Sequence, residues 1–148
     1  MGIANVQVSS VWEAGDVAAF NYSGSDIPAF RLVKIDATNT ASNAVTGAPI
    51  PAMVGVALPA TGGNPDPCWG VTMEIIKAGN SGRVRTRGIA PVLTDGVTTA
   101  GTVVDASATV AGAVKAHTAA KYSIGTALIT AADTEVSLVD ITGANPNA

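Results

Sequence analysis

Cysteine, histidine, aromatic and charged residues are all scarce in this sequence of 148 residues. Charged residues make up 13% of the chain, whereas an ordinary soluble protein has about 25%. A monomer therefore has little charge with which to cover its surface, so uncharged polar residues cover it or part of it is buried against other subunits. We expect both. The single cysteine, Cys68, cannot form an intrachain disulfide, and nothing in the cysteine usage indicates secretion.

Residues that carry catalysis or bind metals are equally few. The one histidine, His117, and Cys68 could pair as base and nucleophile, but no basic neighbour or helix N-terminus activates the thiolate. No zinc, calcium or nucleotide motif is present, and Gly62 and Gly63 lead into prolines instead of a helix with a following lysine. We therefore expect no catalytic residue, no cofactor, no metal site and no enzymatic activity.

The charge balance and the hydrophobic runs limit the partners. A formal net charge of −3 with a pI near 4.8 argues against nucleic acid as a principal ligand. The longest apolar stretch, residues 48–60, is interrupted by prolines and falls short of the ~20 residues of a membrane helix, so we expect a soluble protein with no membrane partner. The N-terminus has neither a basic head nor an apolar run, which predicts no signal peptide and synthesis in the cytoplasm.

Val and Thr recur throughout the chain, and Gly, Pro, Asn and Asp interrupt them every several residues. This pattern is typical of short strands joined by turns. Only two segments, Trp12–Phe20 and Thr118–Lys121, show a weak helical tendency. The sequence thus predicts an all-β protein, a compact β-sandwich or barrel of short antiparallel strands. The candidate strands are Arg31–Asp36, Met53–Leu58, Val71–Lys77, Gly82–Ile89, Thr102–Asp105, Tyr122–Ile129 and Glu135–Ile141.

The chain divides into three parts. We place the β domain at residues 31–141 and a flexible tail at residues 142–148. Residues 1–30 differ in character, because Val6–Trp12 alternates like a strand and the residues after it are interrupted by glycines and a proline. This segment is either an extended N-terminal arm that adds to a neighbouring subunit or an ordinary edge strand of the same domain.

An internal duplication is visible within the β domain, although chance similarity among Ala-, Val- and Gly-rich segments is an alternative explanation. It predicts two similar three-strand units. A glycine in each middle strand predicts a bulge or a close backbone approach. The paired segments are Leu32–Thr38 with Gly101–Ser107, Met53–Leu58 with Ser123–Leu128, and Val71–Ile76 with Glu135–Asp140.

The most distinctive charged feature is a row of arginines, Arg83, Arg85 and Arg87, which the period of a strand places on one face. Such a row suits the docking of acidic residues of a partner or neighbouring subunit. The alternative is pairing with Glu74 or with aspartates of an adjacent strand. A nucleic-acid groove is disfavoured, because no aromatic residues interleave with the arginines.

Two tryptophans and the N-terminal valines complete the candidate sites. Trp12 is either an interface anchor or a core residue, and we expect Trp69 in the core. The candidate protein-interface residues are Val6, Val8, Val11, Trp12, Arg83, Arg85 and Arg87.

Several segments together resemble the capsid decoration (cement) proteins of tailed bacteriophages. The resemblance spans residues 27–141 and depends on the order and spacing of short motifs. The loop after Leu58 is longer here than in that family, and the first thirty residues match nothing in it. The motifs are Arg31–Asp36, Val54–Ala57, Gly88–Val92, Ala100–Asp105, Ile124–Leu128 and Glu135–Leu138.

The resemblance implies a β-sandwich or barrel protein that forms a homotrimer on the outer surface of the virion. There it would bridge major capsid protein subunits at local threefold positions and stabilise the head against the pressure of packaged DNA. The resemblance carries over no catalytic residue. Two alternatives stay open: another β-type virion protein, such as a tail or fibre module, and a small glycan-binding β module, which would need exposed aromatics beyond Trp12 and Trp69.

Overall fold

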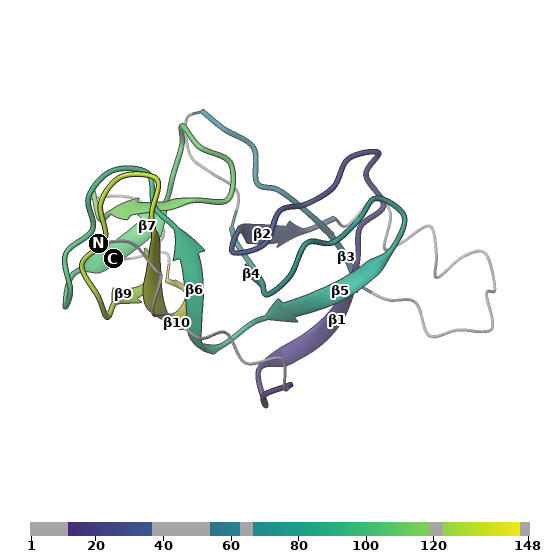
Figure 1. Ribbon diagram of the computed structural model, residues 1–148, viewed down its shortest axis with the longest axis horizontal. Coiled ribbons are helices and arrows are strands. Elements are labelled where there is room, and N and C mark those ends of the chain that lie inside the picture. The colour runs from purple at the N-terminus through teal and green to yellow at the C-terminus, as the bar shows by residue number, and fades with distance from the viewer. Residues whose placement is uncertain (1–11, 37–53, 63–66, 119–122, 146–148) are drawn as a thin grey trace.

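The computed structural model describes residues 12–36, 54–62, 67–118 and 123–145 of the chain. Within these residues the chain forms β-strands and no helix, which confirms the all-β prediction (Figure 1). No helix in the described ranges is long and apolar enough to cross a membrane. The strands are β1 (Asp16–Phe20), β2 (Leu32–Ile35), β3 (Val54–Ala57), β4 (Gly70–Thr72), β5 (Ser81–Arg85), β6 (Gly88–Leu93), β7 (Val103–Ala106), β8 (Val114–Ala116), β9 (Ser123–Ala127) and β10 (Val136–Asn145).

The first five strands close into a barrel with the order β1-β3-β2-β4-β5, which forms the right lobe in Figure 1. β1 runs parallel to β3 and antiparallel to β5, so β1 closes the barrel. Small and β-branched side chains fill the interior, because a barrel of so few strands leaves little space inside. The interior residues are Ala19, Ile27, Val33, Val56, Ile76 and Val84.

The other five strands form a second sheet with the order β6-β10-β9-β7-β8, which is the left lobe in Figure 1. The hydrogen-bonded neighbours in this sheet are all antiparallel. A single parallel bridge between Thr94 and Val114 then joins the end of β6 to β8. This bridge brings the two edges of the sheet together, as β1 and β3 meet in the first barrel.

The two units repeat one topology. If β6 to β10 are matched in chain order to β1 to β5, both units have the same circular strand order, with a parallel contact between their first and third strands. The residue pairing repeats as well. Val33 pairs with Gly70 in the first unit, and Val104 pairs with Gly125 at the corresponding place in the second. The described residues therefore form two copies of a five-strand unit.

The connections between strands follow the same repeat. Ile27 and Ile76 exchange two backbone hydrogen bonds of 3.0 and 2.9 Å in the first unit. Thr98 and Ala131 exchange two of 3.0 Å in the second. The repeat therefore extends to this pair of bridges, which lie outside the regular strands.

A glycine in each unit lies where two strands come too close for a side chain. A Cβ on Gly70 would lie 2.7 Å from the carbonyl oxygen of Arg85, and a Cβ on Gly125 would overlap the carbonyl oxygen of Asp140. Arg85 and Asp140 are corresponding residues of β5 and β10. The close backbone approach predicted at Gly125 is confirmed.

The duplication predicted from the sequence is correct in kind and wrong in detail. β2 and β7 do correspond, but the sequence match places them two residues out of register, since Leu32 corresponds to Val103 and not to Gly101. β9 corresponds to β4 and not to β3, whose true counterpart is the short strand β8. In the described part of the chain each unit has five strands and not three, because β1 and β8 carry too weak a pattern to be recognised and the start of β6 was joined to β5 in one expected strand.

The second unit covers one outer face of the first. Leu32, Val71 and Met73 point away from the interior of the first barrel and are buried in one apolar cluster with residues of the second unit. Two backbone hydrogen bonds fix this contact: the Leu32 amide donates to the Gly112 carbonyl at 2.7 Å, and the Leu93 amide donates to the Phe30 carbonyl at 2.9 Å.

Several expected boundaries are wrong. The strand expected at Val71–Lys77 ends at Thr72, and the segment Gly82–Ile89 is divided between β5 and β6. Trp12–Phe20 contains a turn and a strand instead of a helix. Of the other expected helix, residues 119–121 lie outside the described residues.

The expected division into arm, domain and tail also requires correction. Asp16–Phe20 is neither an arm nor an edge strand, because β1 pairs with strands on both sides and closes the barrel. The tail does not begin at residue 142, since β10 continues to Asn145, which pairs with Ser123. Residues 1–11 and 146–148 lie outside the described residues.

Candidate interaction surfaces

The predicted arginine row lies on β5 and just beyond it. Val84 points into the barrel, so Arg83 and Arg85 point outward, as strand alternation predicts. Both arginines are nevertheless only 5% exposed. Arg87 follows the strand and is exposed.

Asp16 of β1 binds both buried arginines. The Arg85 Nε donates a 2.7 Å hydrogen bond to Asp16 Oδ1, and the Arg85 Nη2 donates a 3.1 Å bond to Oδ2. The Arg83 Nη1 lies 3.9 Å from Asp16 Oδ2. Arg85 Nη1 also donates to the Ile89 carbonyl at 2.7 Å and lies 3.5 Å from the Glu13 carboxylate. This fork pairing holds β1, β5 and the start of β6 together.

The electrostatics of this cluster favour its charged form. Burial alone would raise the pKa of Asp16, but the Arg85 hydrogen bonds, the Glu13 amide and the two guanidinium charges outweigh burial and hold that pKa below its ordinary value. The hydrogen bonds to Asp16 in turn raise the pKa of Arg85. Asp16 is therefore ionised at neutral pH, and its charge is neutralised inside the protomer.

The interface role of the predicted residues stays a prediction. The pairing of Arg83 and Arg85 with an aspartate of an adjacent strand is the alternative that the sequence left open, and it occupies these two side chains within the protomer. Trp12 is 54% exposed and Arg87 is exposed, so both are accessible to a partner. The other three candidates, Val6, Val8 and Val11, lie outside the described residues.

Apart from Trp12, the exposed large apolar side chains were not singled out from the sequence. Strand alternation says that two faces exist, but it does not say which outer face a second unit covers. Only a correct alignment of the two units would have shown which outer positions the second unit covers and which stay exposed. In the described part of the chain, the large apolar residues with high exposure are Trp12, Ile35, Ile75, Ile89, Val97, Val103 and Leu128.

His117 contacts a buried aspartate within the second unit. Its Nδ1 lies 2.6 Å from the Oδ1 of Asp105, a side chain with no exposed surface. The Asp105 Oδ2 accepts a 2.7 Å hydrogen bond from the Thr118 amide. These bonds tie the segment after β8 to the strand β7.

Asp95 fixes the loop after β7. Its carboxylate accepts hydrogen bonds from the hydroxyls of Ser107 and Thr109, which lower the pKa of Asp95. The Ser107 hydroxyl also accepts a 3.0 Å hydrogen bond from the Val110 amide. This network shapes the loop that contacts the first unit through Gly112.

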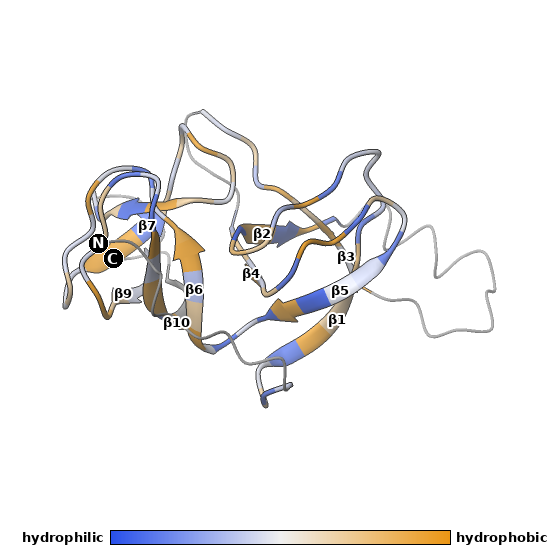
Figure 2. Cartoon of the chain, in the orientation of Figure 1, coloured by the Kyte–Doolittle hydropathy of each residue, from blue (hydrophilic) through white to orange (hydrophobic). Residues whose placement is uncertain are grey.

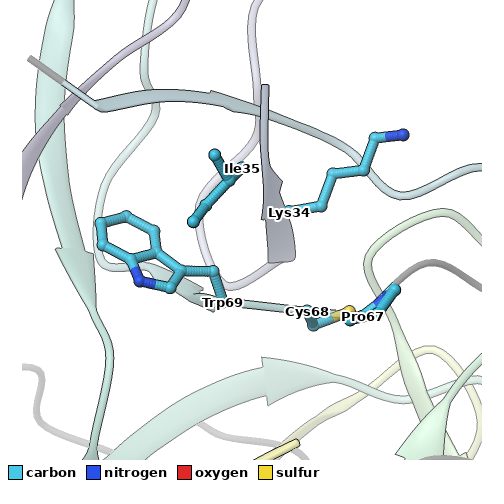
Figure 3. A pocket seen from close by; sticks show the side chains of 5 residues that line it. All are labelled: Lys34, Ile35, Pro67, Cys68 and Trp69. Atoms are coloured by element: carbon cyan, nitrogen blue, oxygen red, sulfur yellow. The ribbon is translucent and has the colours of Figure 1, made fainter. Parts of the chain in front are cut away.

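A pocket of about 420 Å³ lies beside β2 and β4 and is lined by Lys34, Ile35, Pro67, Cys68 and Trp69. Figure 3 shows the Trp69 ring facing Ile35, while the Lys34 side chain extends away from Trp69. Trp69 also packs against the core of the first barrel, as expected. The described lining residues include no carboxylate or imidazole. Among the described residues no group of three or more His, Cys, Asp or Glu side chains could hold a metal ion.

Comparison with solved structures finds a protein with a similar fold. No family model matches the chain, and no curated protein matches its sequence. Among solved structures, the fold is similar to the N base of the head fiber protein gp8.5 of bacteriophage phi29, with a TM-score of 0.58 and 14% sequence identity. The alignment covers 86% of this chain and 92% of that chain. At this identity the match shows a shared fold.

Proposed function

We propose that this chain is a structural protein of a tailed-phage virion that decorates the outside of the head. It binds the capsid shell, bridges subunits of the major capsid protein and stabilises the head against the pressure of packaged DNA. The observation that carries the proposal is the fold shared with the phi29 head fiber N base over almost the whole of both chains. The likeness of the sequence to phage decoration proteins supports the same conclusion independently.

The surface supports a role in assembly more than in chemistry. Charged residues make up only 13% of the chain, and apolar side chains such as Ile75, Val97 and Leu128 are exposed on it. Protein partners would cover such side chains. We include in the proposal that the chain is not an enzyme, that it forms homotrimers and that it binds neither nucleic acid nor membranes.

Trp12 and Arg87 are the side chains that we propose for contact with the shell. Both are exposed, and Arg87 lies beside the residues that follow Trp12, since its Nη2 donates a 3.5 Å hydrogen bond to the Ala14 carbonyl and a Cβ on Gly15 would lie 2.7 Å from its side chain. Tryptophan and arginine are the residues most enriched at the energetic centres of protein interfaces. Neither side chain is needed to fill the core of either unit.

A second candidate is the base of a head fibre, which the identity of the structural neighbour itself favours. A fibre base would share the attachment to the head. It differs in carrying a projecting fibre, so electron microscopy of decorated heads separates the two: a low cap supports decoration, and density projecting far beyond this chain supports a fibre base.

The test is binding of the purified chain to phage heads that lack it. We expect saturable binding and a rise in the temperature at which the heads break. Trp12→Ala and Arg87→Glu should each weaken binding by about tenfold or more, whereas the control Lys77→Glu should bind normally, because Lys77 is exposed and its ammonium group pairs with Asp26 of the same chain. A folded chain that neither binds heads nor protects them would contradict the proposal.

A further inference from the structure

The two units differ at one outer face. The second unit covers this face of the first unit, whereas the same face of the second unit is exposed. In the first unit Leu32 and Met73 lie against the second unit and are 1% and 4% exposed. Their counterparts in the second unit, Val103 and Leu128, are 40% and 41% exposed. Thr126 corresponds to the buried Val71 and is partly exposed. We call Val103, Thr126 and Leu128 the open face.

The correspondence is supported by hydrogen bonds as well as strand pairing. The Met73 amide donates to the Arg83 carbonyl at 2.9 Å, and the Leu128 amide donates to the Leu138 carbonyl at 2.7 Å. Arg83 and Leu138 occupy the same position of β5 and β10. Met73 and Leu128 therefore occupy one position of the repeat, and only the presence of a covering unit differs between them.

The contact inside the chain is head-to-tail, since different surfaces of the two units meet. The first unit uses the outer face of β2 and β4, and the second uses β6 and the loop that ends at Gly112. On β6, Ala90 and Val92 belong to the core, and Pro91 points the other way yet is also buried. A head-to-tail contact leaves two surfaces without a partner: the outer face of the second unit, and the surface of the first unit that corresponds to β6.

The surface of the first unit that corresponds to β6 lies on β1. Ala18 corresponds to Pro91 and is exposed, and Phe20 corresponds to Leu93 and is half-buried. We call Ala18 and Phe20 the β1 side. The open face belongs to β7 and β9 in one lobe, and the β1 side belongs to the other lobe (Figure 1). Figure 2 shows apolar colour along much of β1.

We propose that the open face of one copy of this chain binds the β1 side of a second copy, repeating between chains the contact that joins the two units within a chain. The occupant is a second copy because the same type of unit already covers the same position of the repeat. The contact leaves a free surface of each kind at the ends of any open assembly, so copies close into a ring where the rotation between them permits and otherwise extend as a filament. If the homotrimer of the proposed function is correct, the ring contains three copies, but the contact itself does not depend on binding to heads.

Measurement of mass in solution with single variants tests the contact. Leu128→Asp and Val103→Glu change exposed side chains of the open face, and Ala18→Glu changes an exposed side chain of the β1 side, opposite the cationic Arg83. Each variant should stay folded by circular dichroism and raise the dissociation constant between copies by about tenfold or more. Val97→Asp is the control, because its counterpart is Asp26, which stays exposed although the second unit covers the first.

Mixing two variants separates this arrangement from a symmetric contact between identical faces. Leu128→Asp keeps an intact β1 side, and Ala18→Glu keeps an intact open face, so each alone should be monomeric and an equal mixture should form dimers with one chain of each kind. Monomeric wild-type chain at all concentrations, normal assembly of Leu128→Asp, or a mixture that stays monomeric would each overturn the proposal. None of these results bears on binding to heads, which is measured separately.

Discussion

Asp16 is the residue on which the buried charges of the first unit depend. Its side chain has no exposed surface, and the side chain of Arg85, which binds it, is also almost completely buried. Breaking a buried ion pair from one side leaves the other charge without compensation. We expect Asp16→Asn to lower the free energy of unfolding by about 3 kcal/mol, measured by urea denaturation. Asp26→Asn, which removes an exposed pair with Lys77, should have a much smaller effect, and equal losses in the two variants would contradict the dependence on Asp16.

The same carboxylate should make the protein less stable in acid. The pKa of Asp16 is lower in the folded state than its ordinary value of 3.8, so below that value the unfolded state binds more protons. The stabilisation is thus fully present above the unfolded pKa and is lost as pH falls through the lower folded pKa. We expect wild type and Asp16→Asn to differ in unfolding free energy at pH 7 and to converge as pH falls below 3.8. A difference that stays constant with pH would show that the ion pair is not its cause.

At the scale of strands, corresponding glycines allow β4 and β9 to approach β5 and β10 closely. Gly125→Ala places a Cβ against the backbone of Asp140, and backbone cannot move aside as a flexible side chain can. We expect a loss of about 3 kcal/mol in unfolding free energy, and a smaller but clear loss for Gly70→Ala. Gly24→Ala is the control, because a Cβ there would meet no atom within 4 Å beyond its chain neighbours. Thermal unfolding of the three variants measures this order, and an unaffected Gly125→Ala would mean that the strands are further apart.

The success of the sequence-based predictions varied among the strands for a physical reason. Val-rich segments such as those of β2 and β7 lie in the barrel walls, and their composition alone identifies them as strands. β1 and β8 were missed, because β1 is rich in alanine and β8 has three residues. The bond between Asp16 and Arg85 joins residues far apart in the chain, so the sequence could suggest acidic partners for the arginines but not identify which one.

At the scale of the whole molecule, the two units should unfold together, because one apolar cluster contains residues of both. We expect a single cooperative transition in calorimetry, with equal calorimetric and van't Hoff enthalpies. Leu32→Ala removes a buried side chain from the contact between the units. It should lower the free energy of unfolding by about 3 kcal/mol and broaden the calorimetric transition towards two separate ones.

Val103→Ala is the matched control, because Val103 occupies the position of Leu32 in the second unit but is exposed. At a concentration where copies are dissociated, it should cost less than about 1 kcal/mol. At a concentration where copies associate, the cost should rise, since the side chain would then be buried by a second copy and association stabilises the folded chain. If Val103→Ala lowers the unfolding free energy equally at all protein concentrations, Val103 has the same neighbours in the monomer and in the assembly. The contact between copies would then lie elsewhere on the surface.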